Sequence, residues 1–289
     1  MEYVKRIARG ALRRMGYNIH RIPTEEAPKG ASEEAPAYTG IEVFPLAMVD
    51  LIHRRKGDVF FIQAGAHDGL TYDPMRPFID EYHLPGILIE PQPKIFAKLV
   101  ENYRGAKNLI FENAAVAHQD GEVSLYTFAE GSALPEHATQ LASFRRDALV
   151  HNGHSYEGEV VETRVAAITL SSLLEKHNVE RVDILQLDTE GFDFEIIKMI
   201  DFTRIKPSII SFESAFLSVP EQQACTRLLS SHGYRLATFH VDTVAVLQSN
   251  YREALHAGLE QAMSKKLSPN VKEALPAGLE QAMSKTSAN

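Results

Sequence analysis

Three carboxylates follow strand-like runs of apolar residues and have the type and spacing to do chemistry. Glu90 closes the run GILIE, and Asp188 and Glu190 follow the run DILQL. In open α/β sheets, ligands bind outside the carboxyl ends of the strands, so these side chains are expected to face a ligand. A carboxylate there can accept hydrogen bonds from the hydroxyls of a ribose or take a proton as a general base. The acids therefore indicate a nucleoside site with catalytic groups beside it.

A glycine-framed turn precedes these acids and helps to choose between two nucleoside cofactors. The stretch QAGAHDG places Gly65 and Gly69 four residues apart, which lets the backbone pass close to a ligand. A nicotinamide dinucleotide needs G-x-G-x-x-G opening directly into a helix whose N-terminus meets the pyrophosphate. Here the middle glycine is missing, and TYDPMRPF follows with two prolines where a first helical turn would run. The turn favours S-adenosylmethionine, which carries no phosphate.

Four stretches, taken in order, resemble the FkbM family of S-adenosylmethionine-dependent methyltransferases. They are FIQAGAHDGLTYDP, GILIEPQPKIFAKLVENY, NLIFENAAVA and VDILQLDTEGFDFEII, and the resemblance runs from about residue 55 to 247. It implies the class I methyltransferase fold, in which a seven-stranded sheet has a final antiparallel strand. It also implies O-methylation, typically of a hydroxyl on a sugar or a polyketide-like small molecule. The sequence departs from the family pattern at Gln63 in the first motif and at Phe192 and Asp193 in the last.

The resemblance also gives individual residues a place around the donor. The turn after the first strand would line the methionine end, and Glu90 would hold the ribose. Asn113 and Ala114, at the end of the third strand, would lie beside the adenine, while Asp188 would face the methyl group. The complete predicted donor-binding set is Gln63, Gly65, His67, Asp68, Gly69, Glu90, Pro91, Asn113, Ala114 and Asp188.

A hydroxyl acceptor has to lose its proton when it is methylated, which asks for a general base. Asp188, Glu190 and His67 are the predicted catalytic residues, with Glu213 and His240 as further candidates. A carboxylate desolvated beside a bound sugar can have its pKa raised enough to serve as the base. Because the sulfonium of the donor is already activated, holding the two reactants in line supplies most of the acceleration.

The acids of the last motif also raise the question of a metal. Asp188, Glu190 and Asp193 could bind Mg²⁺ through their oxygens. The same carboxylates are explained by donor binding and by capping of a helix that begins near Phe192, so we predict no metal site. The histidines and the single Cys225 show no zinc-ligand spacing. Neither a G-x-S-x-G hydrolase elbow nor a phosphate-binding loop occurs in the sequence.

Strand-like and helix-like segments alternate from about residue 40 onward. Such alternation predicts a mostly parallel α/β sheet of the Rossmann-like kind, with helices on both faces. The last two strands are too close in sequence for a crossover and are expected to form an antiparallel hairpin. The expected strands are 58–63, 86–90, 108–113, 122–128, 182–188, 207–213, 234–240 and 243–248, and the expected helices are 92–103, 169–177, 192–200 and 219–232.

The chain divides into a predicted methyltransferase domain, residues 40–250, and flanking segments. Residues 1–22 predict a basic amphipathic helix, which either lies on an anionic membrane surface or docks on its own domain. Residues 23–39 have the Pro, Glu and Ala content of a linker. In the helical tail, residues 251–289, EALHAGLEQAMSK recurs after 20 residues as EALPAGLEQAMSK. This repeat is either an oligomerisation or partner helix or a loosely attached tail.

The stretch 133–163 is polar and rich in His and Arg. We expect it to form the acceptor side of the site and a lid. Arg145 and Arg146 within it could hold an anionic acceptor such as a uronate or a nucleotide-sugar. The alternative is a solvated surface loop.

Composition limits the remaining function classes. The net charge of −8 argues against a nucleic-acid partner. The single cysteine suits a reducing compartment, and no apolar run is long enough to cross a bilayer, so we expect a cytoplasmic protein with membrane-surface contact through residues 1–22. The expected partners are a small-molecule or glycan acceptor and a second copy of the chain. Alternatives are a nicotinamide-dependent oxidoreductase or epimerase on the same sheet, and a non-catalytic module that binds a partner through its terminal helices.

Overall fold

The structure is a computed structural model that describes residues 44, 47–48, 51–52, 54–71, 73–129, 141–150, 160–239 and 241–248. The predicted N-terminal helix, the linker, the C-terminal repeats and His240 lie outside the described residues. So do residues 133–140 and 151–159 of the predicted acceptor loop, 133–163.

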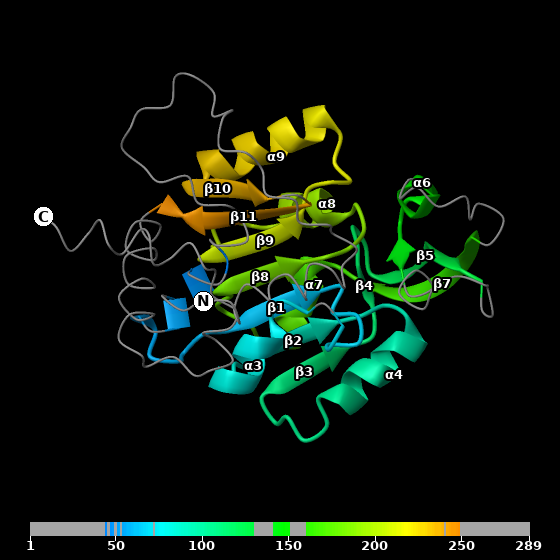
Figure 1. Ribbon diagram of the computed structural model, residues 1–289, viewed down its shortest axis with the longest axis horizontal. Coiled ribbons are helices and arrows are strands. Elements are labelled where there is room, and N and C mark those ends of the chain that lie inside the picture. The colour runs from blue at the N-terminus through cyan, green and yellow to red at the C-terminus, as the bar shows by residue number, and fades with distance from the viewer. Residues whose placement is uncertain are drawn as a thin grey trace, which may run out of the picture.

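The main sheet has seven strands, the number that the family resemblance implies (Figure 1). Six strands run in the same direction, and β11, which lies between β9 and β10, runs antiparallel to them. The predicted antiparallel hairpin at the end of the sheet is thereby confirmed. The order is β10-β11-β9-β8-β1-β2-β3, formed by β1 (Phe61–Ala64), β2 (Gly86–Ile89), β3 (Leu109–Glu112), β8 (Ile184–Leu187), β9 (Ile209–Glu213), β10 (Tyr234–Phe239) and β11 (Asp242–Leu247).

Helices cover both faces of this sheet, as predicted. Side chains alternate along a strand, so Phe61 of β1 packs into one core and its neighbour Ile62 into the other. The first core holds α3 (Arg76–Tyr82), α4 (Pro93–Asn102) and the buried helical residues Phe44, Ala47, Met48, Leu51 and Ile52. The second core holds α7 (Leu170–Lys176), α8 (Asp193–Lys198) and α9 (Val219–Ser231). Burial on both sides explains why β1, β2 and β8 read as apolar runs.

Local signals fix where the covering helices begin. Ser218 and Glu221 form a capping box at the start of α9, each satisfying a backbone amide of the other. Thr169 caps α7, where its hydroxyl accepts the Ser172 amide at 3.1 Å. A proline lies in the first turn of α4, where its missing amide hydrogen costs no helical hydrogen bond.

A second sheet lies beyond the carboxyl ends of the main strands, toward which the arrowheads of β1 and β8 point in Figure 1. Its order is β4-β7-β5-β6, formed by β4 (Ala115–Val116), β5 (Gly121–Phe128), β6 (Ala142–Ser143) and β7 (Val160–Ile168), with α6 (Arg146–Val150) following β6. β5 pairs with β7 along its whole length, antiparallel. This sheet walls the site from the side opposite to the main strands.

The second sheet corrects two expectations. Residues 122–128 belong to it, although the sequence pattern placed them in one continuous α/β alternation. Residues 160–163 open a nine-residue strand, although they were expected to lie in a loop. The reason is that one face of β7 is open to solvent, so its run VVETRVAAI alternates polar and apolar residues and reads as polar.

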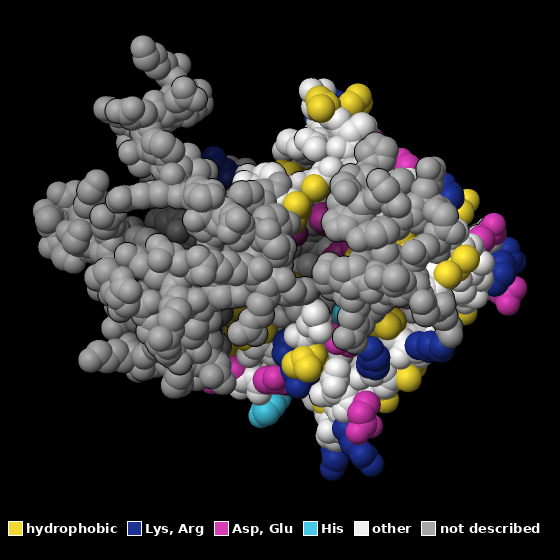
Figure 2. All heavy atoms as spheres, turned by 45° about the vertical axis from the view of Figure 1, so that its right-hand side comes forward, with side chains coloured by type: hydrophobic (Ala, Val, Ile, Leu, Met, Phe, Trp, Pro, Cys, Tyr) yellow, Lys and Arg dark blue, Asp and Glu magenta, His cyan; other side chains and the backbone are white. Residues whose placement is uncertain are grey.

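Both kinds of charge are interspersed over the described surface that Figure 2 shows. Some oppositely charged side chains of the described residues form ion pairs, as Arg164 does with Glu122 and Arg104 with Glu101. No helix of the described part of the chain is long and apolar enough to cross a membrane. The absence of a nucleic-acid partner stays a prediction.

Candidate active site

A cleft opens between the carboxyl edge of the main sheet and the second sheet. The ends of β1, β2 and β8 form its floor, and β5 and β6 contribute one wall. The residues that line it from the main-sheet side include Gln63, Gly65, His67, Glu90, Pro91, Ala114, Gln186, Asp188 and Glu190. Those from the second sheet and its flank include Ala115, Val116, Leu125, Leu141, Ala142, Ser143 and Phe144. Most of the predicted donor-binding set therefore surrounds one space.

The glycine turn is required by the packing of the protein itself. A Cβ on Gly65 would lie 1.7 Å from the backbone oxygen of Asp188, and Gly65 has φ +79. A Cβ on Gly69 would lie 2.5 Å from the Tyr103 ring and 2.6 Å from Leu99, both on the α4 side. This packing is a reason for the two glycines that the sequence did not show, and the predicted close passage of the backbone to a ligand stays a prediction. These glycines let the turn fit between β8 and α4, and the fit places its other residues over the cleft.

Glu90 holds the cleft edge together from a buried position. It is 4% exposed. Its carboxylate accepts the His67 amide at 3.1 Å and the Gln92 amide at 2.9 Å, and thus joins the turn after β1 to the loop after β2. Burial raises the pKa of Glu90 to about 7, against these hydrogen bonds. Its role in binding the ribose stays a prediction. The carboxylate can still accept hydrogen bonds from ribose hydroxyls in addition to those from the two amides.

Three predicted donor-binding residues do not line the cleft, and instead support the residues that do. Asp68 accepts hydrogen bonds from the backbone amides of Leu70 and Thr71 and from the Thr71 hydroxyl, which closes the turn. Asn113 donates its side-chain amide to the backbone oxygens of Glu90, at 2.8 Å, and Pro91. Gly69 packs against α4 as described above. We expect these three to position the site rather than touch a ligand.

Two glutamines lie next to each other beneath the cleft. Gln63 of β1 and Gln186 of β8 are paired in register, and they are 3% and 6% exposed. The Gln63 amide donates to Asp73 at 3.0 Å. The Oε1 oxygens of both glutamines are buried without a hydrogen-bond partner among the described residues. A buried oxygen without a hydrogen-bond partner destabilises the fold, so both oxygens can accept hydrogen bonds or a positive charge from a ligand at the floor of the cleft.

Sequence reasoning missed Gln186, although a signal was present. It interrupts the apolar strand ILQL as Gln63 interrupts FIQA, and both strands are buried throughout. A polar side chain inside a fully buried parallel strand needs a partner, and here the described protein supplies none to either oxygen.

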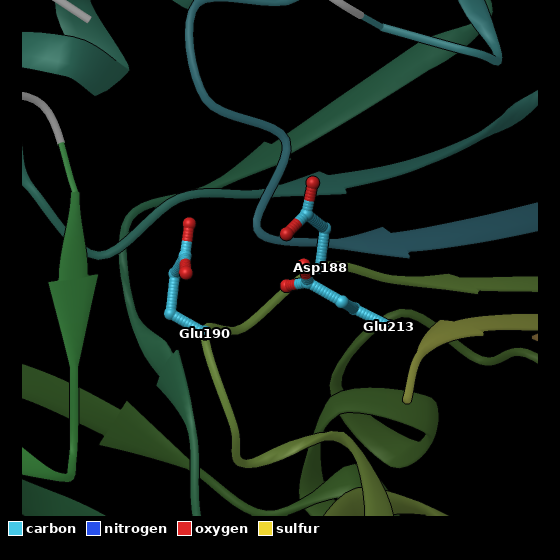
Figure 3. A group of neighbouring side chains, drawn as sticks. All are labelled: Asp188, Glu190 and Glu213. Atoms are coloured by element: carbon cyan, nitrogen blue, oxygen red, sulfur yellow. The ribbon is translucent and has the colours of Figure 1, made fainter. Parts of the chain in front are cut away.

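Three carboxylates meet at the carboxyl edge of the sheet, as Figure 3 shows. Asp188, Glu190 and Glu213 each offer an oxygen, and these oxygens lie within 4.8 Å of one another. Asp193, which the sequence grouped with the first two, is not part of the cluster. It is fully buried and accepts the amides of Thr189 and Glu213, at 2.9 and 2.8 Å. The helix-capping interpretation of Asp193 is therefore wrong, because its carboxylate ties the turn after β8 to β9.

Glu190 is held in an unusual backbone conformation. Its φ is +52, in the left-handed region that disfavours a side chain with a Cβ. The Ser143 hydroxyl of the second sheet donates a 2.6 Å hydrogen bond to the Glu190 carbonyl and helps to fix this turn. His67, in the turn after β1, also has a positive φ of +51. Strained residues of this kind cluster at functional sites, and both of these line the cleft.

The electrostatics of the acid cluster favour protons or cations. Burial, and then the neighbouring carboxylate of Glu190, raise the pKa of Asp188 well above its usual range. Burial and the surrounding acids also raise the pKa of Glu190 and Glu213. The Asp188 side chain itself is open to the cleft, although protein surrounds it closely. Among the described residues, none forms a salt bridge with the three carboxylates.

The cleft fits S-adenosylmethionine by the chemistry of its lining. Glu90 offers a buried acceptor for ribose hydroxyls, and the small residues Ala114 and Ala115 leave room for a ring. The orphaned Gln63 oxygen suits the donor's ammonium group. The carboxylate of Asp188, the residue predicted to face the methyl group, lines the same cleft.

The sheet order, its inserted antiparallel strand and the lining of its carboxyl edge define a class I methyltransferase fold. Residues 63–236 match the family described as the methyltransferase FkbM domain. The chain belongs to this family and is an S-adenosylmethionine-dependent methyltransferase. This membership favours methyl transfer over the alternatives of a nicotinamide-dependent enzyme and a non-catalytic module.

Solved structures similar to this chain include other methyltransferases. One is precorrin-6y C5,15-methyltransferase from Geobacter metallireducens GS-15, with 12% identity, 70% of this chain and 83% of that chain covered, and a TM-score of 0.36. Another is fibrillarin from Aeropyrum pernix with natively bound S-adenosyl-L-methionine, with 11% identity, 70% and 76% covered, and a TM-score of 0.33. A search of curated proteins found no match.

Proposed function

We propose that the protein transfers a methyl group to a hydroxyl oxygen of a small molecule, with a saccharide or glycan as the acceptor class. The observation that carries this proposal is the cluster of Asp188, Glu190 and Glu213 at the carboxyl edge of the sheet. A nucleophilic oxygen needs an acceptor for its proton, and Asp188 and Glu190 open onto the cleft that also contains Glu90. The choice of a saccharide rests on the family resemblance.

The chain's own residues have two tasks in this reaction. When bound, S-adenosylmethionine supplies an activated methyl group, which forms a bond to the acceptor oxygen as its bond to sulfur breaks. The protein holds the acceptor oxygen in line with that bond, which supplies a large part of the acceleration. A carboxylate oxygen of Asp188 or Glu190 takes the hydroxyl proton, and the sulfur keeps the electron pair of the broken bond. His67, on the rim of the same cleft, is the next candidate base.

The second sheet provides the side of the cleft that we assign to the acceptor. Phe144, Leu125 and Leu141 line it there, and the Phe144 ring packs at a tilt against Phe192 at the start of α8, with the ring centroids 4.2 Å apart. Apolar and aromatic surface of this kind suits the faces of a sugar ring or a polyketide-like chain.

Arg145 has a different place from the one expected for an anion-binding residue. It donates two hydrogen bonds to Asp147, the shorter at 2.6 Å, and contacts the Phe216 carbonyl at 3.4 Å. The described contacts of Arg145 are thus with the protein, and Asp147 raises the pKa of its guanidinium. We therefore favour a neutral acceptor over a uronate.

Location and partners remain part of the proposal. A cytoplasmic enzyme with a small-molecule or glycan acceptor agrees with the single cysteine and the acidic composition. Contact with a membrane surface through residues 1–22, and pairing of two copies of the chain, are carried by segments outside the described residues.

The test is methyl transfer from labelled S-adenosylmethionine to a panel of neutral glycans, uronate-containing glycans, lipids and hydroxylated small molecules. Label should appear on a hydroxyl oxygen, as shown by mass spectrometry of the product. Transfer exclusively to nitrogen or carbon acceptors would contradict the proposal, while labelling of a uronate in preference to neutral sugars would reverse the acceptor choice.

A further inference from the structure

The acid cluster contains three carboxyl groups, whereas a general base that takes one proton needs only one. Three carboxyl groups from two neighbouring strand ends converge, and no described residue supplies a positive partner within salt-bridge distance. Asp188 and Glu213 follow β8 and end β9, which pair in parallel, so the sheet itself sets them side by side. Their separation is fixed by the fold and needs no rearrangement of the backbone.

A second observation, the buried side-chain oxygen of Gln186, also indicates a ligand near the acid cluster. Gln186 precedes Asp188 by two residues, so the two side chains leave the strand on the same face. Both line the cleft. The Gln186 side chain is 94% buried, being 6% exposed, and its Oε1 oxygen has no hydrogen-bond partner among the described residues. An amide oxygen is an acceptor for a hard cation or for the water molecules that such a cation carries.

We propose that Asp188, Glu190 and Glu213 bind a divalent cation of the Mg²⁺ class, with Gln186 as an additional oxygen toward it. The proposal goes beyond the transfer of a methyl group and departs from the sequence-based prediction of no metal. Oxygen ligands in an octahedral shell lie about 3 Å apart. The three carboxylate oxygens already lie within 4.8 Å of one another, which is close to that spacing.

The chemistry of the ligand set selects the kind of cation. It consists of carboxylate and amide oxygens, with no histidine or cysteine among its members. Such a set suits Mg²⁺, Mn²⁺ or Ca²⁺ rather than zinc or copper. Asp188 remains open to the cleft, so coordination positions are left for water and for an oxygen of the acceptor.

A role for the cation in the reaction rests on the proposed hydroxyl acceptor. A cation bound by Asp188 and Glu213 would coordinate the acceptor oxygen, fix it near the methyl group and lower the pKa of its hydroxyl. The proton would still pass to a carboxylate or to water at the mouth of the cleft. Binding of the cation itself does not depend on that role, so it can be tested alone.

The experiment measures Mn²⁺ binding to the full chain after removal of metals with a chelator, without donor or acceptor. Electron paramagnetic resonance reports free Mn²⁺, so its signal should fall saturably, by one ion per chain, and recover when Mg²⁺ is added in excess. Glu213→Gln and Asp188→Asn should each weaken Mn²⁺ binding at least tenfold. Glu162→Gln, on the exposed part of β7, changes the net charge equally and should leave binding unchanged.

Equal Mn²⁺ binding by the wild type and by Glu213→Gln would overturn the proposal, and so would the lack of saturable binding by the wild type. Thermal unfolding of each variant shows whether it is folded, and Glu190→Gln replaces any variant that is not. Because no substrate is present, this outcome is independent of the proposed function. A chain that binds Mn²⁺ but methylates no hydroxyl would contradict the proposed function alone.

Discussion

The backbone oxygen of Asp188 lies where the side chain of residue 65 would begin, 1.7 Å from the Cβ position of Gly65. Gly65 also has φ +79. Gly65→Ala must therefore push β1 and β8 apart at the floor of the cleft, and we expect a loss of at least about 3 kcal/mol in the free energy of unfolding. Urea denaturation monitored by circular dichroism measures this loss.

The control for Gly65→Ala is Gly105→Ala. Gly105 also has a positive φ, +91, but a Cβ there would meet nothing within 4 Å. Its loss should be about 1 kcal/mol, the cost of the backbone conformation alone. Equal losses at the two positions would show that the close approach to Asp188 is unimportant.

The donor affinity should depend on Glu90. Glu90→Ala removes the predicted hydrogen bonds to the ribose and also releases the amides of His67 and Gln92. We expect the affinity for S-adenosylmethionine to fall by roughly 2 to 4 kcal/mol. Isothermal titration calorimetry measures it, with Glu101→Ala on the exposed side of α4 as the control. Unchanged affinity in folded Glu90→Ala protein would remove the ribose assignment.

The stability of the protein should fall as pH rises, and Glu90 should contribute to that fall. Its pKa is raised from 4.5 to about 7 in the folded state, so the fold favours the protonated carboxyl. The stabilisation is complete below about pH 4.5 and is lost as pH rises through about 7, by about 3 kcal/mol. Glu90→Gln cannot ionise, so its free energy of unfolding relative to the wild type should increase by that amount between pH 5 and 9. A constant difference across this range would contradict the assignment of the shift to Glu90.

The parts of the site that lie within one strand and its following turn could be predicted from the sequence. QAGAHDG and GILIE each carry their pattern within a few residues, and the structure places Gly65, His67 and Glu90 together as expected. The packing of Gly65 against the backbone of Asp188 could not be predicted. The two residues approach each other only after β1 and β8 pair across more than a hundred residues of sequence.

The composition of the acid cluster shows the same limit. Asp193 is near Glu190 in sequence, and Glu213 is distant. Pairing of β8 with β9 brings Glu213 to Asp188, while the start of α8 turns the Asp193 carboxylate inward to two backbone amides. The second sheet was missed for a related reason. β7 is half exposed, and its partner β5 lies some forty residues earlier, as in the pair Tyr126 and Glu162.

The N-terminal segment gives a prediction that does not depend on the described residues. If residues 1–22 form a membrane-surface helix, the full chain should sediment with anionic liposomes at low salt and detach as salt rises. A chain that begins after residue 22 should stay in the supernatant. Equal sedimentation of the two chains would assign the segment to docking on its own domain instead.

The sharpest prediction separates donor binding from catalysis at Asp188 and Glu190. Asp188→Asn and Glu190→Gln keep the shape of each side chain but remove its ability to take a proton or to bind a cation strongly. We expect donor affinity, measured by calorimetry, to stay nearly intact, because the ribose contact belongs to Glu90. Turnover should fall by roughly two to four orders of magnitude, the usual contribution of a general base.

Glu162→Gln should retain full turnover. Normal turnover in both variants would move the base to His67, which lines the same cleft, and collapse of donor affinity would assign the two acids to the donor site. Asp188 is the more important of the two in this proposal, since it directly follows β8 and is the residue predicted to face the methyl group.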